Sequence, residues 1–199
     1  MATLYLVPAP LHESGSLHWL SSDEKVMISA TRHFIVEELR TARRLLRRID
    51  PVFPIDDSQF FLLNEHTRDA DIAPLLLPLK KGQNVVLMSE AGCPGVADPG
   101  SSVVLAAHRA GIKVVPLIGP SSILMALMAS GLNGQYFTFH GYLPAKPGER
   151  AAALRKIEKA SRDTGAAQIF IETPYRNKAM LSDIINTCNP ETRLCLAMN

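Results

Sequence analysis

A run of glycine and proline residues between positions 89 and 100 constrains the fold more than any other part of this sequence. It reads S-E-A-G-C-P-G-V-A-D-P-G and separates the apolar segment 85–88 from a helical pattern over 101–110. Open α/β sheets bind ligands in loops at the carboxyl ends of their strands. Glycine lets the backbone approach a ligand closely, and proline fixes the path of the loop. The sequence therefore predicts a ligand-binding loop here, with a rigid crossover loop as the alternative.

The same loop argues against two common nucleotide-binding classes. The chain contains neither G-x-G-x-x-G nor G-x-x-x-x-G-K-[ST]. These glycine patterns define dinucleotide-binding Rossmann proteins and P-loop NTPases. We therefore expect a different mode of ligand binding.

Composition indicates an ordinary globular protein. The 199 residues allow one or two domains, and the net charge of +2 requires any basic patch to be local. Three widely spaced cysteines, Cys93, Cys188 and Cys195, indicate a reducing compartment. The N-terminus has no basic leader, and no apolar run approaches the roughly 18 residues of a membrane span. We expect a cytoplasmic protein without a membrane segment.

Short apolar segments alternate with segments of helical spacing. The predicted strands are residues 3–7, 34–36, 60–63, 84–88, 113–117, 136–139, 168–171 and 194–197. The predicted helices include residues 38–49, 69–81, 148–163 and 175–188. This alternation predicts an α/β fold with mostly parallel strand pairing. Gly119-Pro120 is the predicted hinge, which places one domain at 1–116 and a second at 117–199.

Polar residues follow several predicted strands, where they would face a cleft. Glu37, Glu38 and Arg40 follow the strand 34–36, and the acidic pair either stabilises a helix N-terminus or orients an acceptor hydroxyl. Ser121 and Ser122 either cap a helix or offer hydroxyls and amides to a carboxylate or ribose.

Several other side chains keep two interpretations. Glu172 is either part of a cap or a cleft residue, and His66 either faces the cleft or is an ordinary surface residue. Cys93 is a polar contact rather than a nucleophile, because no base lies near it in sequence. The histidines show no metal-ligand spacing, so we expect no metal. The five arginines between 40 and 48 form a solvated face or contact phosphates.

Five segments together resemble the tetrapyrrole-methylase-like S-adenosylmethionine (SAM)-dependent methyltransferases. Within that class they are most similar to the bacterial 16S rRNA (cytidine ribose 2′-O)-methyltransferase family. The segments are T-L-Y-L-V-P-A-P at 3–10, the loop 89–100, V-V-P-L-I-G-P-S at 114–121, F-H-G-Y-L-P-A-K at 139–146 and I-E-T-P-Y-R at 171–176. The chain departs from the family at 12–16, 37–40 and 64–67, which lie on the substrate side. Ala197 begins the family's terminal A-R-E-L-T, so the second lobe is expected to be incomplete.

The resemblance implies two α/β lobes, the first with a mostly parallel sheet and the second with a mixed sheet, and SAM in the cleft between them. It also implies a homodimer and an acceptor in ribosomal RNA or the small ribosomal subunit. Carried over by position, the cofactor would be lined by Pro8, Gly92, Cys93, Pro94, Val96, Ser121, Ser122, Leu143, Glu172 and Ala197. The acceptor would face Glu37, Glu38, Arg40 and His66. A small-molecule acceptor such as a tetrapyrrole, and a SAM-binding module without catalysis, remain the alternatives.

Overall fold

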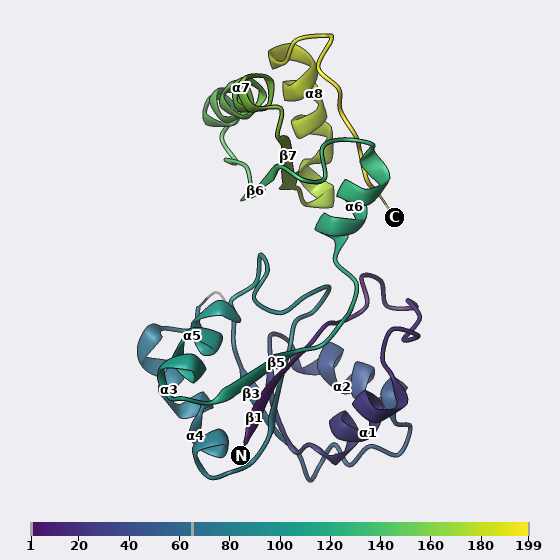
Figure 1. Ribbon diagram of the computed structural model, residues 1–199, viewed down its shortest axis with the longest axis vertical. Helices are drawn as coiled ribbons and strands as arrows, with labels where there is room; N and C mark the ends of the chain where they lie inside the picture. The colour runs from purple at the N-terminus through teal and green to yellow at the C-terminus, as the bar shows by residue number, and fades with distance from the viewer. Residues whose placement is uncertain (1, 65, 199) are drawn as a thin grey trace. The chain divides into compact units, whose positions relative to one another are not determined.

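The computed structural model describes residues 2–64 and 66–198, which form two compact units, Met1–Ser121 and Ser122–Asn199 (Figure 1). The division falls after Ser121 rather than after Pro116, immediately beyond Gly119-Pro120. The fold is α/β, as the alternation of strands and helices predicts.

The first unit is built on one parallel sheet. Its strands are β1 (Thr3–Val7), β2 (His33–Val36), β3 (Gln59–Leu62), β4 (Val85–Met88) and β5 (Lys113–Pro116). Its helices are α1 (Ser22–Ala30), α2 (Leu39–Ile49), the 3₁₀ turn η1 (Asp69–Asp71), α3 (Ile72–Leu75), α4 (Leu77–Lys80) and α5 (Ser101–Arg109). The strand order is β3-β2-β4-β1-β5, and every neighbouring pair is parallel. The loops after β4, β1 and β5 therefore leave the same edge of the sheet side by side.

Alternation of side chains along the strands builds a core on each face of this sheet. Leu4, Val85 and Leu87 face α3, α4 and α5, whereas Val86 and Met88 face α1 and α2. Figure 1 shows these two groups of helices on opposite sides of the sheet. All four residues of β4 are buried, as expected for a central parallel strand covered on both faces.

The second unit holds β6 (Phe137–Tyr142) and β7 (Ala167–Ile171), which pair in parallel. Its helices are α6 (Ser122–Ser130), α7 (Pro147–Thr164), the 3₁₀ turn η2 (Pro174–Arg176) and α8 (Asn177–Thr187). Leu154 and Ile157 of α7 pack with Met180 and Ile184 of α8 in its core. Gly165 ends α7 in the left-handed conformation at φ 69°, which glycine adopts without steric cost.

Three details differ from the sequence-based expectations. Residues 194–197 form no strand, and their side chains are exposed. The second sheet, expected to be mixed, contains only a parallel pair within the described residues. The expected helix over 69–81 is divided into η1, α3 and α4, because Pro74 and Pro78 lack the N–H that a continuous helix needs.

Candidate functional site

Loops after three neighbouring strands meet in the first unit. Ala9, just beyond β1, and Gly92, in the loop after β4, exchange two backbone hydrogen bonds of 2.9 and 3.0 Å. The thiol of Cys93 lies 3.4 Å from the carbonyl oxygen of Pro120, beyond β5. The sequence singled out these loops separately, and the structure brings them together.

Pro8 and Gly119 set how closely two of these loops approach. A Cβ added to Gly119 would lie 2.4 Å from the Cβ of Pro8, which is far inside van der Waals contact. Only glycine therefore fits at position 119 with this backbone. Pro8 itself is buried and forms the wall against which the loop after β5 rests.

The loop after β4 is shaped mainly by its backbone. Gly92 and Gly95 have φ values of 73° and 77°, and Ala97 has a φ of 59°, which is uncommon for a residue with a side chain. The buried hydroxyl of Ser89 donates to the carbonyl of Gly92 at 3.0 Å. Pro94 is buried, whereas Val96 is 48% exposed. The loop is thus a turn shaped by its backbone, and the side chain of Val96 is exposed on it.

Burial raises the pKa of the Cys93 thiol above its usual value. A raised pKa keeps the sulfur protonated at neutral pH, and a protonated thiol is a poor nucleophile. This agrees with Cys93 acting as a polar contact.

The carboxylate of Glu38 caps helix α2. It accepts hydrogen bonds from the backbone N–H of Arg40 at 2.9 Å and of Thr41 at 2.6 Å. These bonds hold the pKa of the Glu38 carboxyl below its usual value. A carboxylate held in this way is a weak proton acceptor, so the structure supports the capping interpretation for Glu38.

Glu37 belongs to a group of carboxyls at the ends of the adjacent strands β2 and β4. Its carboxyl is hydrogen-bonded to that of Asp98, whose pKa is raised by burial. Burial and the charges of Glu37 and Glu38 also raise the pKa of Glu90. Burial raises the pKa of Asp98 more than its hydrogen bonds with Gly100 and Glu37 lower it. Sequence analysis missed Glu90 and Asp98, because only the pairing of β2 with β4 places them beside Glu37.

Arg40 and His66, the other residues expected to face the acceptor, are both exposed. Arg40 lies in the first turn of α2. The backbone N–H of His66 donates to the Asn64 side chain at 3.0 Å. Both lie on segments that follow strands of the first sheet, but the structure assigns them no role of their own.

In the second unit, Leu143 and Glu172 are linked through Arg176. The Nη2 atom of Arg176 donates to the carbonyl of Leu143 at 2.9 Å and lies 3.0 Å from Glu172 Oε2. The Glu172 side chain is only 7% exposed, yet among the residues that the structure describes Oε2 has no hydrogen-bond partner beyond this ion pair. Oε2 therefore retains acceptor capacity for a hydroxyl or an ammonium group.

Ser121, Ser122 and Ala197 are the remaining expected cofactor residues. Ser121 is half-buried and is the last residue of the first unit. Ser122 is the first residue of α6 and is exposed. Ala197 is exposed and lies outside any helix or strand. In the second unit, Arg176 thus connects Leu143 with Glu172, and Ser122 and Ala197 are not part of this set of contacts.

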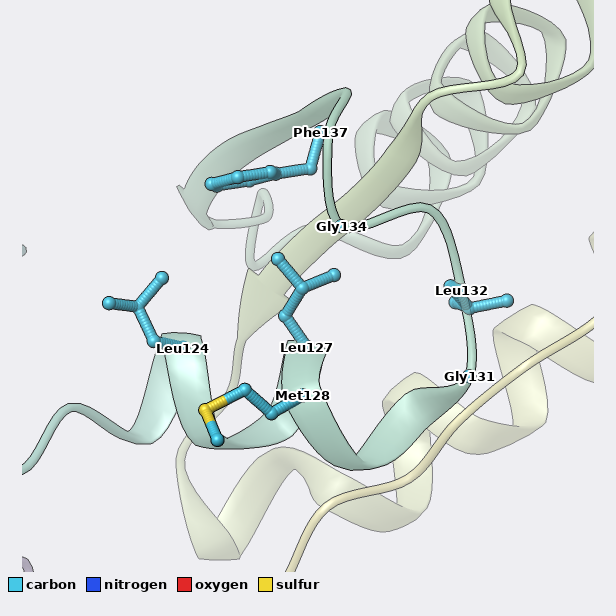
Figure 2. Close-up of a pocket in the computed structure, with 7 residues that line it drawn as sticks. All are labelled: Leu124, Leu127, Met128, Gly131, Leu132, Gly134 and Phe137. Carbon is cyan, nitrogen blue, oxygen red and sulfur yellow. The ribbon is translucent and has the colours of Figure 1, made fainter.

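Two open depressions are lined by other residues. One, of about 360 Å³, lies in the second unit between α6 and the segment leading to β6 (Figure 2). Its lining is entirely apolar side chains and glycine: Leu124, Leu127, Met128, Gly131, Leu132, Gly134 and Phe137. The other, of about 750 Å³, lies between α3, α4 and α5 in the first unit. Neither contains a residue of the expected cofactor set.

Each unit by itself has features that suit a ligand such as SAM. In the first unit, the backbone-shaped loops after β1, β4 and β5 allow close approach of a small ligand. In the second unit, Glu172 Oε2 is a buried acceptor. Within the described residues, no group of three or more His, Cys, Asp or Glu side chains is arranged to hold a metal ion. Among those residues, too, no helix combines the length and apolarity needed to cross a membrane.

Comparison with known proteins defines the class. The family model for tetrapyrrole (corrin/porphyrin) methylases matches residues 5–198, so the chain belongs to this family. The crystal structure of the methyltransferase CobJ superposes with a TM-score of 0.59 and 19% identity, over 95% of this chain and 77% of that chain. This likeness confirms the fold.

Curated relatives give a narrower comparison. "Ribosomal RNA small subunit methyltransferase I" of Vibrio cholerae is 34% identical over 98% of this chain and 63% of its own length. The protein of the same name from Escherichia coli O157:H7 is also 34% identical, over 98% of this chain and 64% of its own length. The chain thus spans a little less than two thirds of these relatives.

Proposed function

We propose that this protein is a SAM-dependent methyltransferase whose acceptor is a ribose 2′-hydroxyl of ribosomal RNA. The observation that carries the proposal is the 34% identity to ribosomal RNA methyltransferases over 98% of the chain. The meeting of three backbone-shaped loops at one edge of the first sheet supports it, because a small ligand binds in such a place.

The cofactor contacts that we propose are the residues carried over from the family resemblance. In the first unit these are Pro8, Gly92, Cys93, Pro94, Val96 and Ser121. In the second they are Ser122, Leu143, Glu172 and Ala197. When bound, SAM supplies a methyl group activated by its sulfonium. The protein's task is then to hold the acceptor in line with that methyl group and to exclude water.

The carboxyl pair of Glu37 and Asp98 would accept the proton of the acceptor hydroxyl. A ribose hydroxyl is a weak nucleophile, so a positioned base assists its reaction. The raised pKa of Asp98 makes this carboxyl a stronger base than an ordinary carboxylate. Arg40, exposed in the neighbouring turn, would contact a phosphate, and His66 would lie near the acceptor.

We also infer that the protein acts in the cytoplasm as a homodimer. A ribosomal RNA acceptor places it where ribosomes are assembled. The homodimer stays a prediction from the family resemblance, and light scattering of the purified protein would test it.

Transfer of a radiolabelled methyl group tests the activity. The purified protein is incubated with labelled SAM and with separated RNA, protein and small-molecule fractions. Label in small-subunit RNA, with transfer that falls steeply as salt is raised, is the expected result. Label found only in small molecules would show that the acceptor is a small molecule and not RNA. Tight SAM binding with no labelled product would overturn the proposal that the protein is an enzyme.

Glu37→Gln tests the proposed base. We expect turnover to fall by roughly 10²- to 10⁴-fold, the usual contribution of a general base. SAM affinity should stay within a factor of two or so, because Glu37 lies on the acceptor side in this proposal. Glu38→Gln is the matched control and should lower turnover far less, since Glu38 caps α2. Equal losses of turnover in the two variants would show that Glu37 is not the base.

A further inference from the structure

Two arginines of α2 hold the segment that follows β1. Arg48 donates from Nη1 to the carbonyl of Glu13 at 2.6 Å and from Nη2 to the carbonyl of Gly15. Arg44 is ion-paired to the Glu13 carboxylate. One planar guanidinium thus spans two carbonyls of the same turn, a fork that lysine cannot reproduce.

The held segment is itself a compact turn. The N–H of Gly15 donates to the carbonyl of His12 at 2.8 Å. His12 Nδ1 lies 2.9 Å from the Ser14 hydroxyl, and His18 Nδ1 lies 2.8 Å from the Ser16 hydroxyl. A Cβ at Gly15 would lie 3.0 Å from the His12 carbonyl oxygen and 3.1 Å from Pro10 Cβ. Residues 12–18, hereafter the β1 loop, therefore present two fixed His–Ser pairs on an exposed surface.

The position of the β1 loop connects the two halves of the proposed site. The chain reaches it directly from Ala9, which is bonded to Gly92 in the loop after β4. Its other attachment is α2, through Arg44 and Arg48, and Glu38 caps the N-terminus of this helix. Figure 1 shows the purple segment after β1 passing on the side of the sheet that carries α2. The β1 loop is thus joined at one end to the loop that carries Pro8 and Ala9, and through Arg44 and Arg48 to the helix that Glu38 caps.

We propose that Arg44, Arg48 and Glu13 are positioning residues that fix the β1 loop as a wall of the acceptor site. This inference depends on the proposed function, because it assigns the wall to the same reaction. The inference also gives most arginines of α2 a role in contacts within the protein, where the sequence suggested a solvated face or phosphate contacts. Arg43 lies over the Phe60 ring at 5.4 Å, and Arg47 donates to the Pro51 carbonyl at 2.8 Å. Four of its five arginines therefore have partners within the protein, which leaves less of this face for RNA phosphates.

Arg48→Lys tests the inference, with Arg47→Lys as a control of equal charge on the same helix. In Arg48→Lys, amides of residues 11–17 should exchange hydrogen several-fold faster, because the fork is lost. The KM for RNA should rise about three- to tenfold, while SAM affinity and the salt dependence of RNA binding stay unchanged, since the charge is kept. Arg47→Lys should leave both the exchange and the KM unchanged.

Glu13→Gln and Gly15→Ala approach the same loop without altering an arginine. Both should raise the KM for RNA, as Arg48→Lys does. If the arginines instead bind phosphate, Glu13→Gln removes a nearby negative charge and RNA should bind more tightly, which would overturn the inference. Unchanged amide exchange in Arg48→Lys would also overturn it.

Failure of the two proposals is distinguishable. A wild-type protein that transfers no methyl group to RNA defeats the proposed function. The exchange measurement needs neither RNA nor activity, so it still tests whether the arginines hold the β1 loop. Faster exchange without any change in the KM for RNA would leave the loop held but remove it from the acceptor site.

Discussion

The loops that follow strands are fixed differently in the two units. In the first unit, glycine conformations, close backbone approach and the Ala9–Gly92 bridge shape the loops after β1, β4 and β5 next to the strands, and arginines hold only the outer β1 loop. In the second unit, arginine side chains hold the corresponding segments after β6 and β7. The buried side chain of Arg150 bonds to Asp183 at 2.6 Å and to the Ala145 carbonyl at 2.7 Å, and Arg176 bonds to Leu143.

This difference shows where a sequence is informative about a site. A backbone-shaped loop requires glycine and proline at fixed places, so it appears directly in the sequence. A loop held by an arginine depends on a single side chain outside the loop's own turn, and nothing in the sequence pattern of the loop marks that contact. The comparison also predicts different responses to substitution in the two units.

The largest effect is expected for Arg150→Met in the second unit. The Arg150 side chain is 4% exposed, and its removal leaves the Asp183 carboxylate and a carbonyl without their donor. Loss of one partner of a buried ion pair costs about 3 kcal/mol of stability. Denaturant unfolding, combined with hydrogen exchange over residues 147–187, measures the loss.

The exposed Arg155 of α7 supplies the control for this prediction. Arg155→Met should change stability by less than about 0.5 kcal/mol, as is usual for surface positions. Equal effects at the two positions would show that Arg150 does not organise the second unit.

Gly119→Ala tests the backbone-shaped loops of the first unit. The added Cβ must displace Pro8, and such overpacking costs about 1–3 kcal/mol. SAM affinity, measured by calorimetry, should fall at least about tenfold, because the loops after β1 and β5 move apart. Gly148→Ala is the control, since nothing lies within 4 Å of its added Cβ. Unchanged SAM affinity in Gly119→Ala would show that the contact between Gly119 and Pro8 is not needed for cofactor binding.

Much of the fold could be predicted from the sequence, because its main strands appear as local patterns of apolar residues. The strands at 3–7, 85–88 and 113–116 follow apolar runs with turn signals on both sides, and their bounds match the expectation within about a residue. The segment 194–197 has a similar apolar run but pairs with no strand. A short apolar run indicates burial, and its pairing depends on neighbours that the run does not specify.

Asp98→Asn should have a smaller effect on stability, and in the opposite direction. The raised pKa means that the folded state binds the Asp98 proton more readily than the unfolded chain. The stability that this protonation contributes is fully present below the pKa of Asp98 in the unfolded chain. It is lost as pH rises through the pKa of Asp98 in the folded protein. At pH 7 the variant should therefore be more stable than wild type, by at most about 1 kcal/mol because solvent screens this partly open site.

The advantage of Asp98→Asn should disappear near pH 3, and methyl transfer should fall because the carboxyl pair is broken. Thermal unfolding at several pH values measures the first effect. A variant less stable than wild type at pH 7 would contradict the claim that the ionised carboxylate of Asp98 destabilises the folded protein.

The smallest effect is expected for Cys93→Ala. If the backbone shapes this loop, loss of a weak thiol contact with the Pro120 carbonyl should change SAM affinity by less than about threefold. Calorimetry on the two proteins measures it. A loss of activity greater than a hundredfold would assign Cys93 a chemical role instead.

The candidate site could be predicted only in part. Gly92, Pro94 and Pro8 stand out because backbone shape requires them. Glu90 and Asp98 did not stand out as acceptor-side residues, because their proximity to Glu37 follows from the order of strands in the sheet. Likewise, helical spacing placed the arginines of α2 on one helix but could not show that two of them hold the β1 loop.

Hydrogen exchange with and without SAM tests the central claim most directly. The claim is that the loops after β1, β4 and β5 together bind the cofactor. Saturating SAM should slow amide exchange in residues 9–11, 91–97 and 119–122, and should leave α1 and the apolar depression beside α6 unchanged. Protection confined to that depression, or no protection anywhere, would contradict the account.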